Sequence, residues 1–348
     1  MASKKNLTGL LIIMADTREP ALVWGKEGYG DGEFQTPWGL AVSSDNVLYV
    51  SDSSNHRIQC FRCSDGTFLR KWGKNGSESG EFCHPRGLAI SIDVCSSSQV
   101  LKVMKTVPVL SVFPPGVLPM CVAYLGTERL YVVDEFNHRI QVFDPRTGKF
   151  IHTWGKWGYE TGDFYYPMAC TASARDGSIH VLDSGNSRIQ SFTPDGSIIR
   201  EWSSSLTRET FISPKLSGLS VLGDCHGDLF YFSCGNEMGF SPDPLKASTW
   251  KKTMAGNLWS EGYGVTIAHD NKVYLTNRVN GQEGIDGGRV EGFQSDGTCV
   301  YIWHGTAKTP LDCPLGIVHN VNDNRLYVSD VYANRILVLN LSSSSPLS

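Results

Sequence analysis

Short runs of β-branched, aromatic and other apolar residues recur along the whole chain, separated by Gly, Asp, Asn and Pro. Examples are Val47-Leu-Tyr-Val-Ser-Asp52, Leu130-Tyr-Val-Val-Asp134 and Leu326-Tyr-Val-Ser-Asp330. Each is followed within a few residues by a second run that begins with Arg-Ile. Runs of this composition and length, bounded by turn residues, predict short β-strands joined by tight turns. We therefore expect an all-β chain.

Tryptophan marks a repeat in this strand pattern. The spacings between successive marker tryptophans are 48, 82, 48, 48 and 53 residues, for Trp24, Trp72, Trp154, Trp202, Trp250 and Trp303. A recurring unit of this length, with about four strands in each copy, has the size of a propeller blade. We name its strands A to D from channel to rim. Strand A follows a proline, B ends at an aspartate, C carries the Arg-Ile pair and D ends at the tryptophan.

The repeated motif resembles the NHL repeat. Its Asn-His-Leu-like core occurs here as Asn-His-Arg-Ile at residues 55–58 and 137–140. The resemblance extends to the NHL modules of TRIM-NHL and malin-like ubiquitin-ligase proteins, and it implies a six-bladed β-propeller. The chain lacks the RING cysteine pattern of those ligases. The resemblance therefore implies recognition of a partner, with substrate recognition in ubiquitin-linked pathways as one form of it.

The repeats organise the chain into one propeller over residues 1–340. The last copy lacks strand D, and the strand at 21–25 has no A and B strands before it, so we expect the N-terminal strand to close the last blade. Residues 94–125 form an excess segment in the second blade, interpreted as a true insertion, a retained intron or a degenerate seventh blade. Residues 341–348 are expected to be a disordered tail. The fourth and fifth units are degenerate, with Ser233 and Asn277 at the aspartate position.

Aspartate and arginine recur five residues apart in four copies. Because the same pair returns around the ring, a structural tie in each blade is a better interpretation than a catalytic role. These structural residues are Asp52, Arg57, Asp134, Arg139, Asp183, Arg188, Asp330 and Arg335.

Function is expected on the face where the B–C and D–A loops emerge together. There the residues differ from blade to blade, so the scaffold does not dictate them, and aromatic and arginine side chains are typical of binding hot spots. The predicted binding residues are Trp38, Arg86, His84, Met168, Tyr165, Tyr166, Lys215, Phe136 and Tyr332.

Composition and charge favour a protein partner. The net charge of −4 is unlike that of a nucleic-acid binder, although single-stranded RNA on the same face remains an alternative. A metal-dependent lyase or lactonase-like enzyme is a second alternative, but among the expected A strands only His319 is a metal-ligand type. Cys60 and Cys63 lack a matching second pair for zinc. We expect a cytoplasmic, monomeric, non-catalytic interaction module without cofactor, bound metal or membrane span.

Overall fold

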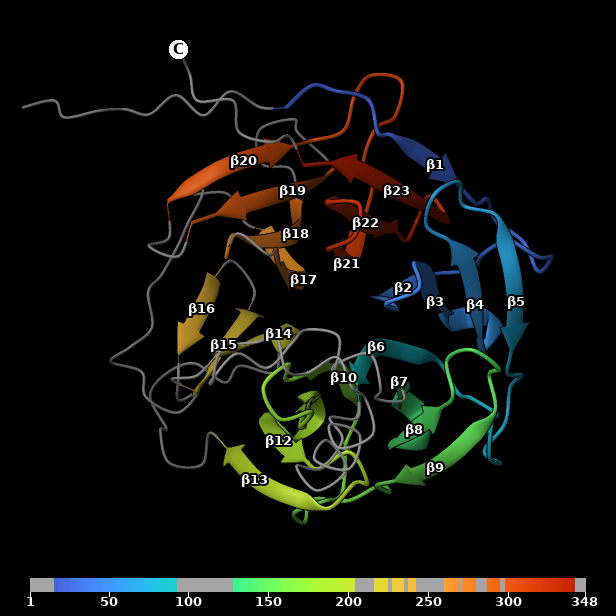
Figure 1. Cartoon of the computed structure of the whole chain (residues 1–348), viewed down its shortest axis with the longest axis vertical. Helices are drawn as coiled ribbons and strands as arrows, with labels where there is room; N and C mark the ends of the chain where they lie inside the picture. The colour runs from blue at the N-terminus through green and yellow to red at the C-terminus, as the bar shows by residue number, and fades with distance from the viewer. Residues whose placement is uncertain are drawn as a thin grey trace, which may run out of the picture.

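The computed structural model describes residues 16–92, 128–203, 216–224, 227–234, 237–241, 260–268, 271–279, 287–294 and 298–341. Its strands form antiparallel sheets that stand side by side around a central axis, with the chain returning to its start (Figure 1). The innermost strands contact one another in the ring order β2, β6, β10, β14, β17, β21 and again β2.

Five sheets are complete four-stranded blades. Their strands are β2 (Pro37–Val42), β3 (Val47–Asp52), β4 (Arg57–Arg62) and β5 (Phe68–Trp72); β6 (Pro85–Ile92), β7 (Glu128–Asp134), β8 (Arg139–Phe143) and β9 (Phe150–Trp154); β10 (Pro167–Ala172), β11 (Ile179–Asp183), β12 (Arg188–Phe192) and β13 (Ile198–Ser203); β17 (Ser260–Ile267), β18 (Val273–Val279), β19 (Gly287–Phe293) and β20 (Cys299–Trp303); and β21 (Pro314–Asn320), β22 (Arg325–Asp330), β23 (Arg335–Asn340) and β1 (Leu22–Trp24). Three-residue 3-10 helices follow β3, β7 and β11, at η1 (Ser53–Asn55), η4 (Glu135–Asn137) and η5 (Ser184–Asn186).

The prediction of a six-bladed propeller is wrong. The structure has five four-stranded blades, and the remaining sector holds a three-stranded sheet of β14 (Leu216–Asp224), β15 (Gly227–Cys234) and β16 (Glu237–Ser241). The complete blades place an acidic or amide residue opposite arginine where strand B ends and strand C begins, whereas this sheet places Cys234 opposite Glu237. Two residues that cannot form the Asp–Arg pair occupy its position. Trp250, the marker of the expected outer strand, lies outside the described residues.

The first and last described strands share one blade. β1 pairs antiparallel with β23, and Ala21 N–H donates a hydrogen bond of 2.7 Å to the Val338 carbonyl. Upstream of β1, the chain also touches the neighbouring blade. The Asp16 amide donates to the Ile302 carbonyl on β20, and the Glu19 carboxylate accepts from Thr306 and Thr309 at 2.7 and 2.9 Å. Residues 16–24 therefore fasten two adjacent blades across the junction of the chain ends.

Marker tryptophans pack against the next blade in the ring. The Trp72 ring on β5 lies 5.8 Å from the Phe143 ring on β8, and the Trp154 ring on β9 lies 5.7 Å from the Phe192 ring on β12. A turn glycine of the next blade covers the tryptophan face. At Gly148, whose φ is +71°, a Cβ would lie 2.9 Å from the Trp72 ring. These contacts bury large apolar areas between blades.

The inner strands approach so closely that glycine is required between them. A Cβ on Gly316 would lie 2.0 Å from the Trp38 carbonyl oxygen, and one on Gly39 would lie 2.2 Å from the Arg86 oxygen. The B strands add hydroxyl bridges, because Ser51 Oγ accepts from Gly39 N–H and donates to the Arg86 carbonyl at 2.7 and 2.6 Å. The ring encloses a central cavity of about 230 Å³, whose described lining is mainly apolar side chains, glycine and threonine.

Several sequence predictions fall outside the described residues. Residues 94–125 and 342–348 are among them, so the interpretations of the excess segment and the tail stay predictions. β6 and β7 are paired up to Ile92 opposite Glu128, on either side of that segment. Within the described ranges, no helix has the length and apolar character of a membrane span.

We predict that Ala21→Pro opens the junction. Proline removes the N–H that donates to Val338, and an unmet buried hydrogen bond costs about 1–3 kcal/mol. The midpoint of urea unfolding should fall, while Ala21→Ser, which keeps the N–H, should leave it near that of the wild type. An unchanged midpoint for Ala21→Pro would show that the junction pairing does not hold the ring closed.

Candidate functional site

The D–A loops of three blades are built on one plan. In each loop an isolated β-bridge pairs a residue near the start of the loop with a fully buried phenylalanine. These phenylalanines are Phe34, Phe82 and Phe164. The loop begins at a glycine with positive φ, and a Cβ on Gly25 would lie 2.6 Å from the Phe34 ring. The loop is therefore folded back on a buried aromatic anchor rather than left extended.

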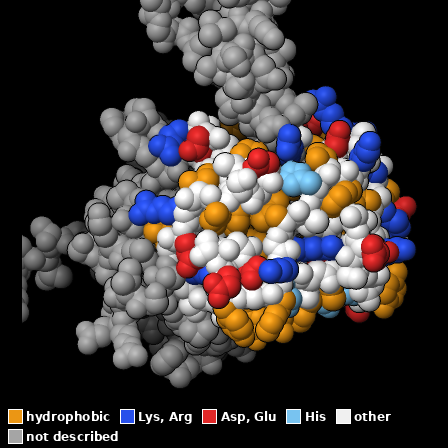
Figure 2. Space-filling model, turned by 90° about the horizontal axis from the view of Figure 1, so that it is seen from below, with side chains coloured by type: hydrophobic (Ala, Val, Ile, Leu, Met, Phe, Trp, Pro, Cys, Tyr) orange, Lys and Arg blue, Asp and Glu red, His pale blue; other side chains and the backbone are white. Residues whose placement is uncertain are grey.

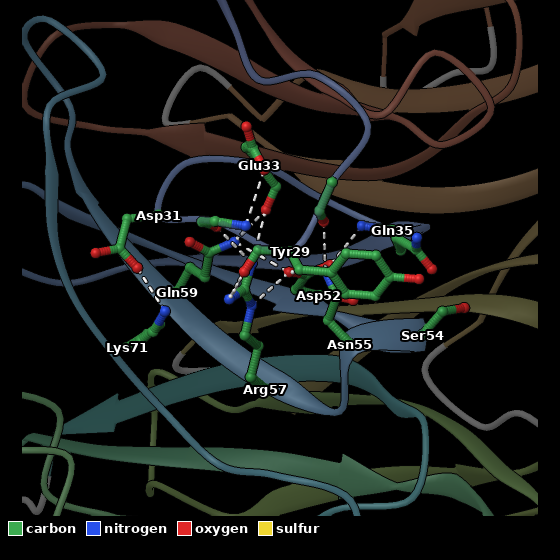
Figure 3. A network of polar contacts seen from close by, with 12 residues as sticks. Tyr29, Asp31, Glu33, Gln35, Asp52, Ser54, Asn55, Arg57, Gln59 and Lys71 are labelled. Carbon is green, nitrogen blue, oxygen red and sulfur yellow. Dashed lines mark hydrogen bonds and ion pairs between the residues drawn. The ribbon is translucent and has the colours of Figure 1, made fainter.

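A buried carboxylate ties each of these loops to the B–C corner of its own blade. Asp52, at the end of β3, accepts hydrogen bonds from Gln35 N–H at 2.7 Å and from Arg57 Nε at 2.7 Å (Figure 3). Arg57 extends over the loop and donates to the carbonyls of Tyr29, Gly30 and Glu33 at 2.7–2.9 Å. Its guanidinium thus satisfies three loop carbonyls while it pairs with the carboxylate.

The same tie recurs in the next two blades. Asp134 accepts from Cys83 N–H and Arg139 Nε at 2.7 and 2.8 Å, and Asp183 accepts from Tyr165 N–H and Arg188 Nε at the same distances. Asp330 likewise accepts from Arg335 and from the Cys313 amide. Burial raises the pKa of all four aspartates, and hydrogen bonds from backbone amides and arginines oppose that rise, with an asparagine adding to the opposition in the first three. The contacts are those of a tie within the blade, and no exposed reactive group results.

In one blade, the buried carboxylate that pairs with arginine lies on strand C instead of at the end of strand B. Asn277 stands opposite Arg289 where the other complete blades have aspartate, and Glu291 stands where three of them have glutamine and the last has Leu337. Asn277 Nδ2 donates to Glu291 at 2.8 Å, and Arg289 Nε lies 3.1 Å from the same carboxylate. The Asp–Gln combination has become Asn–Glu, so one buried carboxylate still faces one arginine.

Histidines of the Asn-His-Arg-Ile motif join one blade to the next. His56 Nδ1 accepts from the backbone N–H of His84 at 3.1 Å, and His138 Nδ1 accepts from that of Tyr166 at 3.2 Å. At the junction of the last and first blades, Asn334 Oδ1 accepts from Thr36 N–H at 3.0 Å in the same way. The three donors all have positive φ, between 49° and 56°. Sequence analysis missed this role because the donor lies 28 residues downstream of each histidine.

The pKa of both histidines is lowered. Burial is the main cause for each, and His84 adds to the effect at His56, whereas Asp134 opposes it at both histidines. A neutral imidazole can accept at Nδ1, but an imidazolium cannot. The neutral form is therefore the one that fits the seam between blades.

The seams bring seven rings from three blades into one row, which we call the aromatic band. Consecutive ring centroids are 4.6–5.7 Å apart, and the order of the rings is Trp157, Tyr159, Tyr165, Tyr166, Phe136, His84 and His56. His138 supports the row from the side, 5.0 Å from Tyr166. Trp157, Tyr159 and Phe136 are 57, 62 and 45% exposed. On the side drawn in Figure 2, hydrophobic side chains lie in the middle of the surface and along its lower border.

The other predicted binding residues whose side chains are described are not members of the band. Arg86 stacks on the Trp38 ring at 3.6 Å and pairs with Glu135 at 2.6 Å, so its charge is already engaged. Met168 lines the central cavity. Tyr332 is exposed beside Arg278, and Lys215 lies outside the described residues. Four predicted residues, His84, Phe136, Tyr165 and Tyr166, are thus together, and their binding role stays a prediction.

The residues considered for metal binding are engaged elsewhere. Cys60 and Cys63 are buried, and burial raises the pKa of each thiol to about 12. His319 Nε2 lies 3.1 Å from Asn324 Oδ1. Among the described residues, no three His, Cys, Asp or Glu side chains are grouped as a metal site would need.

Comparisons with known proteins match a small part of the chain by sequence and most of it by fold. Residues 34–61, which hold Asp52 and Arg57, match the NHL repeat. Over 52 residues, 15% of this chain, it is 48% identical to protein lin-41 of Caenorhabditis elegans and 44% identical to E3 ubiquitin-protein ligase TRIM71 of Gallus gallus. The matched part is only 4 and 6% of those proteins.

Two solved structures share the fold at low identity. A Bacteroides thetaiotaomicron protein of unknown function aligns with a TM-score of 0.56 and 14% identity, over 91% of this chain and 74% of that one. Virginiamycin B lyase from Staphylococcus aureus aligns with a TM-score of 0.50 and 14% identity, over 90 and 82% of the chains. At this identity the likeness shows the propeller fold alone.

We predict that the buried carboxylate of a blade can be moved from the end of strand B to strand C without losing its pairing with arginine. Asp52→Asn alone leaves Arg57 without its carboxylate, and breaking a buried pair costs about 3–5 kcal/mol. Adding Gln59→Glu recreates the Asn277–Glu291 arrangement and should recover at least half of the lost free energy of unfolding, measured by urea denaturation. If the double variant were no more stable than Asp52→Asn, the two arrangements would not be equivalent.

A second prediction concerns pH. Because the folded-state pKa of His56 and His138 lies below the ordinary value of about 6.5, their contribution to stability is complete above that pH and is lost as pH falls through the lowered pKa. The melting temperature should drop on acidification toward pH 5. His56→Asn with His138→Asn, which copies the Asn334 seam, should reduce that drop. A drop as large as that of the wild type would exclude the seam histidines as its cause.

Proposed function

We propose, for a chain that carries an NHL repeat and resembles the NHL-repeat family, that it is a non-catalytic interaction module that binds a protein partner through the B–C and D–A loop face. The observation that carries the proposal is the aromatic band, in which loops of three blades contribute rings to one continuous row. Exposed aromatic side chains grouped on a rigid surface are typical of the residues that dominate binding energy.

The loops that carry the band are fixed before any partner arrives. Arg188 donates to the carbonyls of Tyr159, Glu160 and Asp163 at 2.7–2.9 Å, so the loop that presents Trp157 and Tyr159 is held on its carboxylate tie. A surface that is already ordered loses little conformational entropy on binding. This supports a preformed interface over a loop that orders on contact.

The charges around the face support a protein partner over RNA. Each of three D–A loops begins with a lysine that faces an acidic residue of the same loop, with N–O distances of 3.0, 3.0 and 3.8 Å for Lys26–Glu33, Lys74–Glu81 and Lys156–Asp163. Phosphate binding needs cations that are available to the backbone of the nucleic acid. Here the lysines are balanced locally, and the chain carries a net charge of −4.

The proposal extends to the cellular process and the compartment in which the chain acts. TRIM71 is named as an E3 ubiquitin-protein ligase, and by analogy we propose that this module selects a partner in a ubiquitin-linked process. We further propose a cytoplasmic monomer. The cysteines whose side chains are described are free thiols, which supports a reducing compartment.

The test is affinity capture followed by direct binding. The full chain and its Phe136→Ala/Tyr159→Ala variant are used as baits, with and without ribonuclease, and one captured protein is purified for titration. We expect a ribonuclease-resistant partner whose affinity falls at least tenfold, about 1.4 kcal/mol, with the variant. Tyr29→Ala, an exposed tyrosine outside the band, is the control. Equal affinity for both baits, or loss of all partners with ribonuclease, would refute the proposal.

A further inference from the structure

The aromatic band has a chemistry that narrows the class of partner segment. We propose that it binds an extended, proline-rich peptide in the polyproline II conformation. This rests on the proposed function, since it names what the same face would recognise. Three properties of the band support the inference. They are the spacing of its rings, the tilt between neighbouring rings, and the pairing of the charged side chains beside it with opposite charges.

The spacing of neighbouring rings is compatible with the period of such a peptide. Polyproline II has three residues per turn and rises about 3.1 Å per residue, so one turn advances about 9 Å. From Trp157 through Tyr159 to Tyr165, the successive centroid distances are 5.6 and 5.7 Å. From Tyr165 through Tyr166 to Phe136 they are 4.6 and 5.4 Å. Two steps along the band can therefore span the advance of one turn, so a side chain that returns once per turn can meet alternate rings.

Ring tilt leaves surfaces on which proline can pack. The planes of Trp157 and Tyr159 meet at 71°, those of Phe136 and Tyr166 at 79°, and those of His56 and His84 at 75°. Edge-to-face neighbours do not cover one another's faces as stacked rings would. Rings that meet edge to face leave parts of their faces uncovered by each other, and Trp157, Tyr159 and Phe136 are also exposed, as in the aromatic surfaces that receive proline-rich segments.

Hydrogen bonding fits the same ligand. A polyproline II segment makes no internal hydrogen bonds, so its carbonyls need donors from outside. Tyr159, Tyr165 and Tyr166 each bring a hydroxyl to the aromatic band, and a tyrosine hydroxyl can donate to a carbonyl. An aromatic row with polar tips can therefore pack against the proline rings and meet the peptide backbone.

Charges beside the band argue against an anionic ligand. Arg86 is paired with Glu135 and stacked on Trp38, and Arg139 is tied to Asp134 and to loop carbonyls. A phosphopeptide or an RNA strand would have to break the Arg86 and Arg139 pairs to use these guanidinium groups, whereas an uncharged peptide leaves them intact.

The experiment uses the folded full chain on an immobilised array of twelve-residue peptides that sample sequences around a Pro-x-x-Pro core. A matched array has both prolines replaced by alanine. We expect saturable binding to members of the first array and at least tenfold weaker binding to their matched partners. Binding that does not distinguish the two arrays, or no binding to either, would overturn the inference.

Variants then locate the site with the best peptide of the array, by fluorescence anisotropy. Tyr159→Ala and Tyr165→Ala should each weaken it at least tenfold, and Tyr159→Phe, which keeps the ring, should weaken it less. Tyr29→Ala, whose parent side chain is 72% exposed on another loop, should change it less than twofold. Thermal melts confirm that each variant is folded. Equal effects of Tyr29→Ala and Tyr159→Ala would place the peptide elsewhere and overturn the inference.

The two proposals fail in distinguishable ways. If the captured partner is lost with the band variant but the arrays are not distinguished, the band binds a partner of other chemistry, so the proline-rich ligand is wrong while the proposed function stands. If single-stranded U12 RNA binds, and Tyr159→Ala abolishes that binding, the face is a nucleic-acid surface and both proposals are overturned.

Discussion

A buried carboxylate at the end of a strand B is the contact on which the functional face depends. Asp52, Asp134 and Asp183 are fully buried, and each accepts from an arginine of its own blade and from a backbone amide of the preceding D–A loop. The arginine in turn donates to carbonyls of that loop. Neither ion would be stable alone in this environment, since an unpaired buried charge is costly. The pair therefore holds the loop in one place.

Fixed loops allow neighbouring blades to present a shared surface. The seam contacts of His56 and His138 fix the position of the next blade's D–A loop, because each accepts a hydrogen bond from the amide of the residue just before the next blade's proline. Variable residues near these contacts then meet across the seam. Phe136 of one blade contacts Tyr166 of the next, and the row continues to Trp157. A repeated scaffold thus places non-repeated rings in register, and partner recognition is proposed to arise from that row.

The sequence alone predicted the features that repeat within a blade. The five-residue Asp–Arg spacing and the tryptophan period follow from contacts inside one unit or with the next one, so they leave a fixed pattern. Features that depend on register were harder to predict. The repeat pattern predicted Ser233 at the aspartate position, but strand pairing places Cys234 there, opposite Glu237. The number of complete blades was overestimated in this same sector.

The binding face shows the same limit. Tyr29 and Tyr159 occupy similar positions after a glycine in their loops, yet only Tyr159 has a ring neighbour on both sides in the band. The difference comes from the rest of the loop, because Trp157 and Tyr165 flank Tyr159, whereas Glu27 and Gln35 occupy the corresponding positions around Tyr29. His56 and His138 were recognised as motif residues, but their acceptor role depends on an amide of the following blade.

The central claim is that the carboxylate ties hold the loop face in a single conformation before a partner binds. Amide hydrogen exchange at Gln35, Cys83 and Tyr165, the residues whose N–H groups donate to Asp52, Asp134 and Asp183, tests this most directly. These loop amides should exchange as slowly as those in the middle of β3, β7 and β11. Exchange within about tenfold of the rate of an unstructured peptide would mean that the ties open readily, and it would contradict a preformed face.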